Sequence, residues 1–181
     1  MKRSILVLAL AACGHPAPKQ PSTTVRAEIA AAQTAEKARQ HDRARTHYQA
    51  AIAAAKDPAS IAFARREYAE TLISWGEVAE AMAQLEAVVA ADPDDAASWN
   101  DLGVLRHNQG DDRRALEALE HARAAAPRDP RPRIALAALR WQTGDRAGAA
   151  AEYKELLELE LPDRVRDKVK WALAELAKPP P

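Results

Sequence analysis

The side chains best suited to chemistry in this chain are one cysteine, five histidines and a few neighbouring pairs of carboxylates. The histidines are His15, His41, His47, His107 and His121. A zinc site needs histidines or cysteines a few residues apart on one element, and none of the five stands at such a spacing from a second ligand. The sequence therefore predicts no metal site, and no motif in it indicates a cofactor.

Motifs of enzymes are equally scarce. Gly76, Gly110 and Gly144 fall between expected helices, no glycine-rich loop could bind phosphate, and no serine lies in a nucleophile-elbow pattern. The acidic pairs Asp94-Asp95 and Asp111-Asp112 stand in expected turns, where a carboxylate caps the helix that follows. We therefore predict that the chain is not an enzyme.

Cys13 is the only cysteine, so no disulfide can form within the chain. Residues 1–4 carry two basic side chains, and the eight residues 5–12 are all apolar. Eight residues reach about 12 Å as a helix, which is too short for a bilayer but typical of a signal-peptide core. The run ends Leu10-Ala11-Ala12-Cys13, which resembles the lipobox of bacterial lipoproteins.

The lipobox resemblance implies cleavage after residue 12 and attachment of a lipid to the Cys13 sulfur. Several acyl chains, at about 0.8 kcal/mol per buried CH₂, would anchor such a protein stably in a membrane. By the sorting pattern of enteric bacteria, Gly14 implies delivery to the outer membrane, facing the periplasm. Residues 13–24 then form a lipidated, proline-rich tether. An ordinary secreted protein and a wrongly assigned start codon are the alternatives.

Composition predicts helix for the rest of the chain. Ala, Leu, Glu and Arg are frequent and lose little on entering a helix, whereas β-branched and aromatic residues are too few for a sheet core. The 26 basic and 26 acidic residues balance, so net charge gives no reason to expect a nucleic-acid partner. Locally, residues 58–95 carry two basic and eight acidic side chains, and residues 164–181 five basic and two acidic. This offset either biases the choice of partner or belongs to solvated helix faces.

A pattern of large, small, glycine and proline positions recurs every 34 residues. In residues 96–129 it consists of Trp99, Leu102, Gly103, Gly110, Asp111, Ala115, Leu119, Ala122 and Pro127. This segment resembles a tetratricopeptide repeat almost throughout, and its departure is Arg106, where an aromatic side chain is usual. The same pattern recurs in residues 62–95 and 130–163.

Less regular units flank the three repeats. Residues 25–58 resemble a degenerate first helix pair, whose turn at Arg39-Gln40-His41-Asp42 lacks the usual glycine. Terminal units are often atypical in such arrays. Residues 164–177 are expected to form a capping helix with an apolar stripe and with Asp163 as its N-cap, and residues 178–181 a tail.

The resemblance implies an all-α fold, in which antiparallel helix pairs stack into a short right-handed superhelical α-solenoid closed by the capping helix. No pair can bury its apolar face alone, so neighbouring pairs stack and enclose a concave groove. The small positions that allow close approach are Gly103, Ala115 and Ala122, and the large positions that fill the gaps are Trp99, Leu102 and Leu119. Gly110 would end the first helix at positive φ, and Pro127 would stop the second.

In this family the first helix of each repeat lines the groove with five positions. Carried over, these are Phe63, Arg66, Glu70, Ile73, Ser74, Ala97, Asn100, Val104, His107, Asn108, Arg131, Ile134, Ala138, Trp141 and Gln142. The candidate binding residues among them are Arg66, Glu70, Asn100, His107, Asn108, Arg131 and Trp141. Asn amides can hold a peptide backbone, Arg can bind a carboxylate, and Trp141 either anchors a ligand or packs on the capping helix. Trp75 and Trp171, like Trp99, are expected to be packing residues.

A carboxylate clamp in chaperone-binding relatives uses a lysine and two asparagines. The corresponding residues here are Arg66, Glu70 and Asp101, so two carboxylates replace two amides. Binding of an acidic C-terminal tail in that manner is therefore not expected.

Tether and groove together predict a membrane-anchored scaffold or assembly factor of the bacterial cell envelope, which binds a peptide or helix of a protein partner. Pilotins and accessory proteins of outer-membrane assembly are similar, and docking of a peptidoglycan enzyme is a variant of the same hypothesis. The alternative is a self-associating structural module, a homo-oligomer with an empty groove, for which the charge offset argues.

Overall fold

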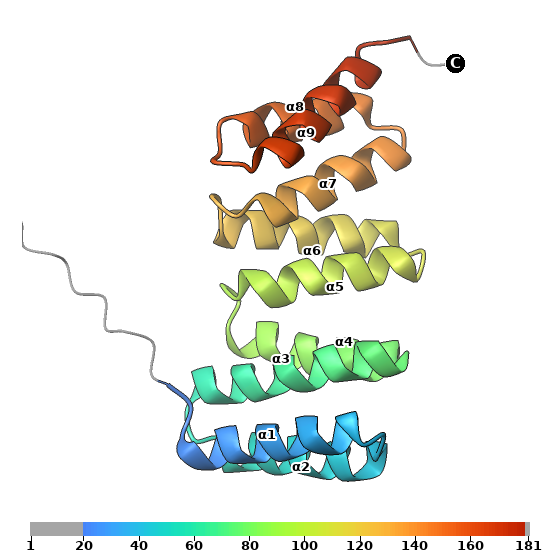
Figure 1. The fold of residues 1–181 in the computed structure, drawn as a ribbon. Helices are drawn as coiled ribbons and strands as arrows, with labels where there is room; N and C mark the ends of the chain where they lie inside the picture. Colours follow the sequence, from blue (N-terminus) through green and yellow to red (C-terminus); the bar gives the residue numbers. More distant parts are fainter. Residues whose placement is uncertain (1–19, 180–181) are drawn as a thin grey trace, which may run out of the picture.

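The computed structural model describes residues 20–179, and within them it contains nine α-helices and no strand (Figure 1). The helices are α1 (Thr23–Lys37), α2 (His41–Ala54), α3 (Pro58–Trp75), α4 (Val78–Ala91), α5 (Ala96–Asn108), α6 (Asp112–Ala125), α7 (Pro130–Gln142), α8 (Arg146–Leu157) and α9 (Asp163–Leu176). Consecutive helices pack as antiparallel pairs, and the pairs stack in chain order. This confirms the predicted all-α solenoid. The predicted signal peptide and Cys13 lie outside the described residues.

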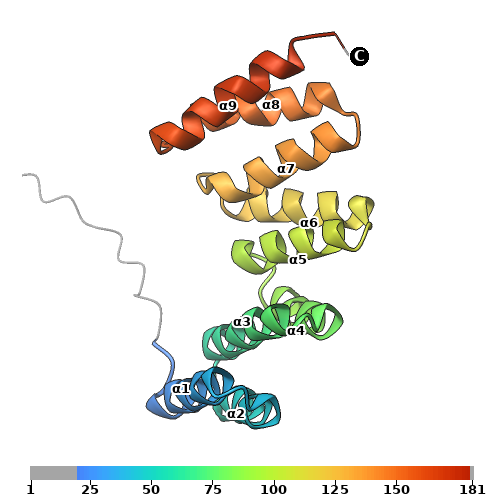
Figure 2. The ribbon, with the colours of Figure 1, turned by 45° about the vertical axis from the view of Figure 1, so that its right-hand side comes forward.

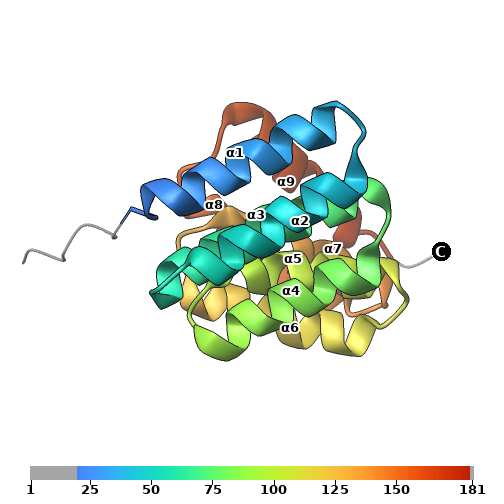
Figure 3. The same ribbon diagram turned by 90° about the horizontal axis from the view of Figure 1, so that it is seen from below.

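The stack of pairs is twisted and curved. Figure 2 shows that successive pairs are rotated relative to one another. Viewed along the stack in Figure 3, α8 and α9 lie behind α1, whereas α4 and α6 lie along the opposite edge. First helices of neighbouring pairs contact each other, α1 with α3 and α5 with α7. The first helices therefore line the inner, concave face, and α4 and α6 lie on the outer one.

Acidic N-caps start most of the helices. The side chain of the residue before α3, α5, α6, α7 and α8 accepts a hydrogen bond from a backbone N–H of the first turn. These caps are Asp57, Asp95, Asp111, Asp129 and Asp145. Each satisfies an N–H that the helix itself leaves unpaired. The acidic turn pairs of the sequence thus include helix caps.

A residue at positive φ ends the first helix of each pair. Gly76, Gly110 and Gly144 have φ of 81°, 81° and 89°, and Arg39 takes the same place after α1 with φ of 57°. The N–H after Arg39 bonds back to Ala35 O, as the N–H after Gly76 does to Leu72 O. The degenerate first pair therefore keeps the turn geometry of the repeats without their glycine.

Within the pair α5–α6, small and large residues interlock. Leu102, Ala115 and Ala122 are fully buried, and a Cβ built on Gly103 would lie 2.5 Å from Cγ of the buried Leu119. Only glycine allows α5 and α6 to approach this closely. Trp99 is half-buried, stacks on His121 and donates from Nε1 to Pro93 O, and Pro127 lies exposed in the turn after α6.

The C-terminal helix α9 covers the last pair with Val169, Ala172 and Leu176. The prediction that Asp163 caps this helix is wrong. Asp163 is the first helical residue, Pro162 holds the cap position, and no side chain bonds the free N–H groups. The carboxylate of Asp163 still lies in the first turn, where its negative charge interacts favourably with the helix dipole.

Candidate protein-binding groove

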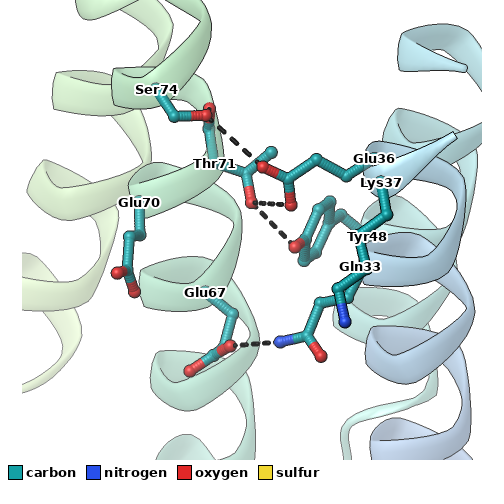
Figure 4. A pocket seen from close by; sticks show the side chains of 8 residues that line it. All are labelled: Gln33, Glu36, Lys37, Tyr48, Glu67, Glu70, Thr71 and Ser74. Carbon is teal, nitrogen blue, oxygen red and sulfur yellow. Dashed lines mark hydrogen bonds between the residues drawn. The ribbon is translucent and has the colours of Figure 1, made fainter. Parts of the chain in front are cut away.

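Two hollows lie side by side on the concave face, one on each side of α3. The first has a volume of about 340 Å³ and is lined by α1, α2 and α3 (Figure 4). The second has a volume of about 440 Å³ and is lined by α3, Leu85 of α4 and Asp101 of α5. Glu67 and Glu70 line both hollows. The two hollows therefore form one groove with these carboxylates on the ridge between them.

The carboxylates of the first hollow bond to neutral donors. Gln33 Nε2 donates to Glu67 over 3.1 Å, while Thr71 and Ser74 hydroxyls donate to Glu36 over 3.4 Å. Figure 4 shows these hydrogen bonds crossing the hollow between α1 and α3. Glu70 lies beside them and forms no hydrogen bond to the other residues drawn. The only cation that lines this hollow is Lys37.

In the second hollow, Arg66 is the only lining cation, and it forms an ion pair with Asp95, the N-cap of α5. Asp101 accepts from Asn100 Nδ2 over 3.3 Å. Among the described residues, Glu70 has no hydrogen bond or ion pair. The groove thus gathers negative charge that Arg66, near Glu67, and Arg131, near Asp101, offset only in part and without an ion pair to either carboxylate.

Burial and like charge raise two carboxyl pKa values in this groove. Burial raises the pKa of Glu67, the charge of Glu70 raises it further, and the hydrogen bond from Gln33 opposes the rise. The groove wall displaces water around Asp101 and raises its pKa, although part of this side chain stays exposed. The hydrogen bond from Asn100 and the charge of Arg131 lower the pKa of Asp101, whereas the charges of Glu70 and Asp95 add to its rise. Ionised Glu67 and Asp101 are therefore held at a cost that a cation in the groove would reduce.

A row of exposed apolar side chains accompanies the carboxylates. Four large apolar side chains are exposed in the part of the chain that the structure describes, and three of them belong to the first helices. Ile73 of α3, Val104 of α5 and Ile134 of α7 are 39%, 42% and 36% exposed. All three stand at positions that the repeat pattern assigns to the groove.

Three of the predicted binding residues are held by acids of this chain. Arg66 pairs with Asp95, Arg131 Nη2 with Asp129 over 2.6 Å, and His107 Nδ1 lies 2.6 Å from Asp112 Oδ1. Arg66 remains 37% and Arg131 65% exposed, so both can still contact a ligand.

The other predicted residues are spread along the concave face. Glu70 lines both hollows, Asn100 lies beside Asp101, and Asn108 is exposed at the end of α5. Trp141 packs edge-on against Tyr153, with ring centroids 6.4 Å apart, and lies 6.3 Å from Trp171. Of the two roles expected for Trp141, the contact with Trp171 agrees with packing on the capping helix α9.

Trp75 stacks on His41 at 4.4 Å, which agrees with a packing role. Trp171 differs from expectation, because 62% of it is exposed. The spacing of apolar residues in the sequence does not reveal how far neighbouring helices cover this position.

Sequence reasoning missed Glu36 and Glu67 as groove residues and considered Asp101 only as a substituted clamp position. Glu36 was overlooked because α1 belongs to the degenerate first pair. Glu67 and Asp101 stand one residue beyond a usual groove position. The signal for Glu67 was its spacing of three residues from Glu70, which places both carboxylates on one helix face.

The described residues 20–179 contain no group of three or more histidine, cysteine, aspartate or glutamate side chains that could hold a metal ion. Among the same residues, no helix is both long enough and apolar enough to span a bilayer.

The helix pairs, their glycine turns and their stacking define the tetratricopeptide-repeat fold, and solved tetratricopeptide-repeat proteins match the chain in structure. MamA matches with a TM-score of 0.69 over 84% of this chain and 80% of its own length, at 16% identity. PilF of Pseudomonas aeruginosa matches with a TM-score of 0.63 over 85% of this chain and 73% of its own, also at 16% identity.

A third match was solved with a peptide. It is the Yersinia enterocolitica type III secretion chaperone SycD in complex with a peptide of the translocator YopD. SycD has a TM-score of 0.58 over 62% of this chain and 88% of its own length, at 19% identity. No protein-family model and no curated protein matches the sequence. The likeness at these identities establishes the fold.

Proposed function

We propose that the chain is a protein-binding scaffold that holds a peptide or helix of a partner protein in its concave groove. The observation that carries this proposal is that Ile73, Val104 and Ile134 are exposed on three successive first helices, and that Ile73 also lines the second hollow. A soluble repeat array gains nothing from apolar side chains left in water on one face, and such surfaces mark sites of interaction. The complex of SycD with a peptide supports binding of this kind by the same fold.

The scaffold acts at the bacterial cell envelope in this proposal. The motivation is the sequence of residues 1–13, whose apolar run and lipobox-like end predict a lipid on Cys13. Gly14 directs the protein to the outer membrane, facing the periplasm. Labelling cells with a radioactive fatty acid checks the anchor: label is expected in the parent chain and lost from Cys13→Ser. Equal label in both chains contradicts lipidation at this residue.

The proposed activity is binding and not catalysis. Beside its carboxylates the groove holds Lys37, Tyr48 and Arg66, and the Thr71 and Ser74 hydroxyls donate hydrogen bonds to Glu36. Such a site can recognise charge and shape.

A pull-down with matched variants tests groove binding. The groove variant combines Ile73→Ala, Val104→Ala and Ile134→Ala, and removes exposed apolar contacts without changing charge. The control combines Ala83→Ser, Ala90→Ser and Ala124→Ser, at exposed positions of the second helices. Loss of partner recovery in the groove variant alone supports the proposal, whereas equal recovery in both variants argues against groove binding. Circular dichroism spectra should show unchanged helix content in the groove variant.

Self-association is the second candidate. It is favoured by the exposed Trp171 on α9, where Lys168 and Lys170 are also exposed, in a chain whose groove is acidic. Sedimentation of the full chain in mild detergent discriminates. A monomer at every concentration excludes this candidate, and a concentration-dependent oligomer that Trp171→Ala dissolves supports it.

A further inference from the structure

We propose that the half of the groove between α1, α3 and α5 selects a basic segment of the partner, in which lysine or arginine side chains alternate with apolar ones. This inference rests on the proposed function and adds to it the chemistry of the ligand. The occupant is a stretch of a partner protein and not a second copy of this chain.

The first step is the charge of the two hollows. Glu36, Glu67, Glu70 and Asp101 supply four carboxylates. The cations that line the hollows are Lys37, in the first, and Arg66, which is already paired with Asp95. A cationic side chain placed on the ridge would be within reach of both Glu67 and Glu70, where like charges now face each other.

The second step is the contrast with the rest of the chain. Arg45 meets Glu77 at 2.6 Å and Glu80 at 2.5 Å on α4. Arg106 meets Glu86, and Arg140 meets Glu120. At these contacts between second helices and their neighbours, the protein supplies its own arginine.

The carboxylates of the hollows instead accept hydrogen bonds from neutral donors, and Glu70 accepts none. Arg66 and Arg131 act on Glu67 and Asp101 only through charge, without an ion pair. Glu36, Glu67, Glu70 and Asp101 take part in no salt bridge among the described residues. A surface that leaves its charges unmatched on one face complements a partner of the opposite charge.

The third step is the mixed character of the wall. Ala69, Ile73 and Leu85 line the second hollow together with the carboxylates. A lysine side chain suits such a wall, because its methylene stem covers apolar surface while the ammonium reaches a carboxylate. The apolar side chains between the basic ones would continue along Val104 toward α7. Volumes of about 340 and 440 Å³ lie at the lower end of the range for ligand pockets, so each hollow has room for a side chain of the partner.

Three fluorescent twelve-residue peptides test the inference by anisotropy with the full chain in mild detergent. They share alanine and leucine at alternate positions and carry lysine, glutamine or glutamate at the others. The lysine peptide is expected to bind at least tenfold more tightly than the glutamine peptide. Its affinity should fall as NaCl is raised, because exposed charge pairs are screened. The glutamate peptide should not bind measurably.

Two matched charge variants locate the effect. The groove variant combines Glu67→Gln, Glu70→Gln and Asp101→Asn, and the control combines Glu117→Gln, Glu155→Gln and Asp167→Asn, which are exposed on other faces. Both variants lose three negative charges. Affinity for the lysine peptide should fall about threefold to fivefold per groove carboxylate, and hence about 30-fold or more, since an exposed pair contributes up to about 1 kcal/mol. The control should change it less than twofold.

Several outcomes would overturn the inference. Equal binding of the lysine and glutamine peptides, abolished by the apolar groove variant, would leave the proposed function standing and refute the charge selection. Equal loss in the groove and control variants would show attraction by overall charge. Failure of all three peptides to bind would also refute it, and the pull-down would still test groove binding by itself. An oligomer that the groove charge variant dissolves would assign the groove to a second copy.

Discussion

Glu152 of α8 accepts a hydrogen bond from Arg133 of α7 over 3.0 Å, and the Glu152 side chain is only 4% exposed. Arg140 of the same helix and Arg123 of α6 complete the cluster, with distances of 3.1 and 2.5 Å to Oε1. One buried carboxylate therefore joins three helices of two repeats. The arginines are 16–33% exposed, so each keeps part of its hydration.

We predict that Glu152→Gln lowers the free energy of unfolding by about 2 kcal/mol. Breaking a fully buried ion pair costs about 3–5 kcal/mol, and the partial hydration of the arginines reduces this value. Urea denaturation followed by circular dichroism measures the change. Glu155→Gln, an exposed residue on the same helix, is the control and should shift the value by less than about 0.5 kcal/mol. A Glu152→Gln variant as stable as the control would contradict a structural role for the cluster.

The approach of α5 to α6 at Gly103 gives a second prediction. Gly103→Ala gains about 1 kcal/mol of helix propensity but forces Cβ against Leu119, and overpacking of this kind costs about 1–3 kcal/mol. We expect a net loss of about 1 kcal/mol. In a Leu119→Ala background only the 3.2 Å approach to Ala115 O remains, so the same substitution should cost much less or become neutral. Equal effects in both backgrounds, measured by urea denaturation, would refute the close contact.

The turn after α1 offers a stabilising change. Arg39 holds φ of 57°, a conformation that costs an L-residue roughly 1–2 kcal/mol and glycine little. Glycine loses more backbone entropy on folding, and this cost offsets part of the gain. Arg39→Gly should therefore raise the free energy of unfolding by about 0.5–1 kcal/mol. The control is Gln49→Gly, at an exposed position in the interior of α2, which should cost about 1 kcal/mol. Thermal unfolding that ranks Arg39→Gly below the parent would show that this turn differs from those at the glycines.

We expect the ionised carboxylates of the groove to lower the stability of the fold while they serve ligand binding. The folded-state pKa of Glu67 lies above its ordinary value of 4.5. The Glu67 carboxyl group therefore binds its proton more strongly in the folded chain than in the unfolded chain. Above the folded-state pKa, where Glu67 is ionised, this side chain lowers the stability of the fold. That cost disappears as the pH falls below about 4.5. Glu67→Gln should accordingly raise stability by up to about 0.5 kcal/mol at pH 7 and by less at pH 4.

Ionised Asp129 affects stability in the opposite direction to ionised Glu67. The hydrogen bonds of Arg131 lower its pKa, so its ionised form stabilises the fold above the unfolded-state pKa, and the gain is lost as the pH falls through the folded-state value. Asp129→Asn keeps a capping side chain and should lower stability at pH 7 by about 0.3–1 kcal/mol, with a smaller difference at acid pH. Urea denaturation at pH 7 and pH 4 compares the two variants. Changes of the same sign would contradict the pKa directions.

The fold could be predicted from the sequence because the pattern is local. Gly110 and Gly144 stand where positive φ ends a helix, and Gly103 opposite Leu119 requires no knowledge of distant contacts. The cap of α9 was predicted wrongly by one residue, because Pro162 and Asp163 both suit the start of a helix.

The groove was predicted less completely, since its charge depends on how neighbouring repeats meet. Arg66 and Arg131 are predicted to contact the ligand, but Arg66 pairs with the aspartate that caps the next first helix and Arg131 with the aspartate that caps its own. The position of a residue in the repeat pattern predicts whether it faces the concave side of the array. It does not predict in which direction a long side chain such as arginine extends. Glu36 and Glu67 approach the same hollow from different pairs, which no single-repeat pattern contains.

Photo-crosslinking in living cells tests groove binding most directly. A photoreactive benzophenone residue replaces either Val104, which is 42% exposed on the concave face, or Glu117, which is 55% exposed on the outer helix α6. The account predicts a discrete covalent adduct with a partner protein from position 104 and none from position 117. Adducts from position 117 alone, or the same adducts from both positions, would contradict a ligand held in the concave groove.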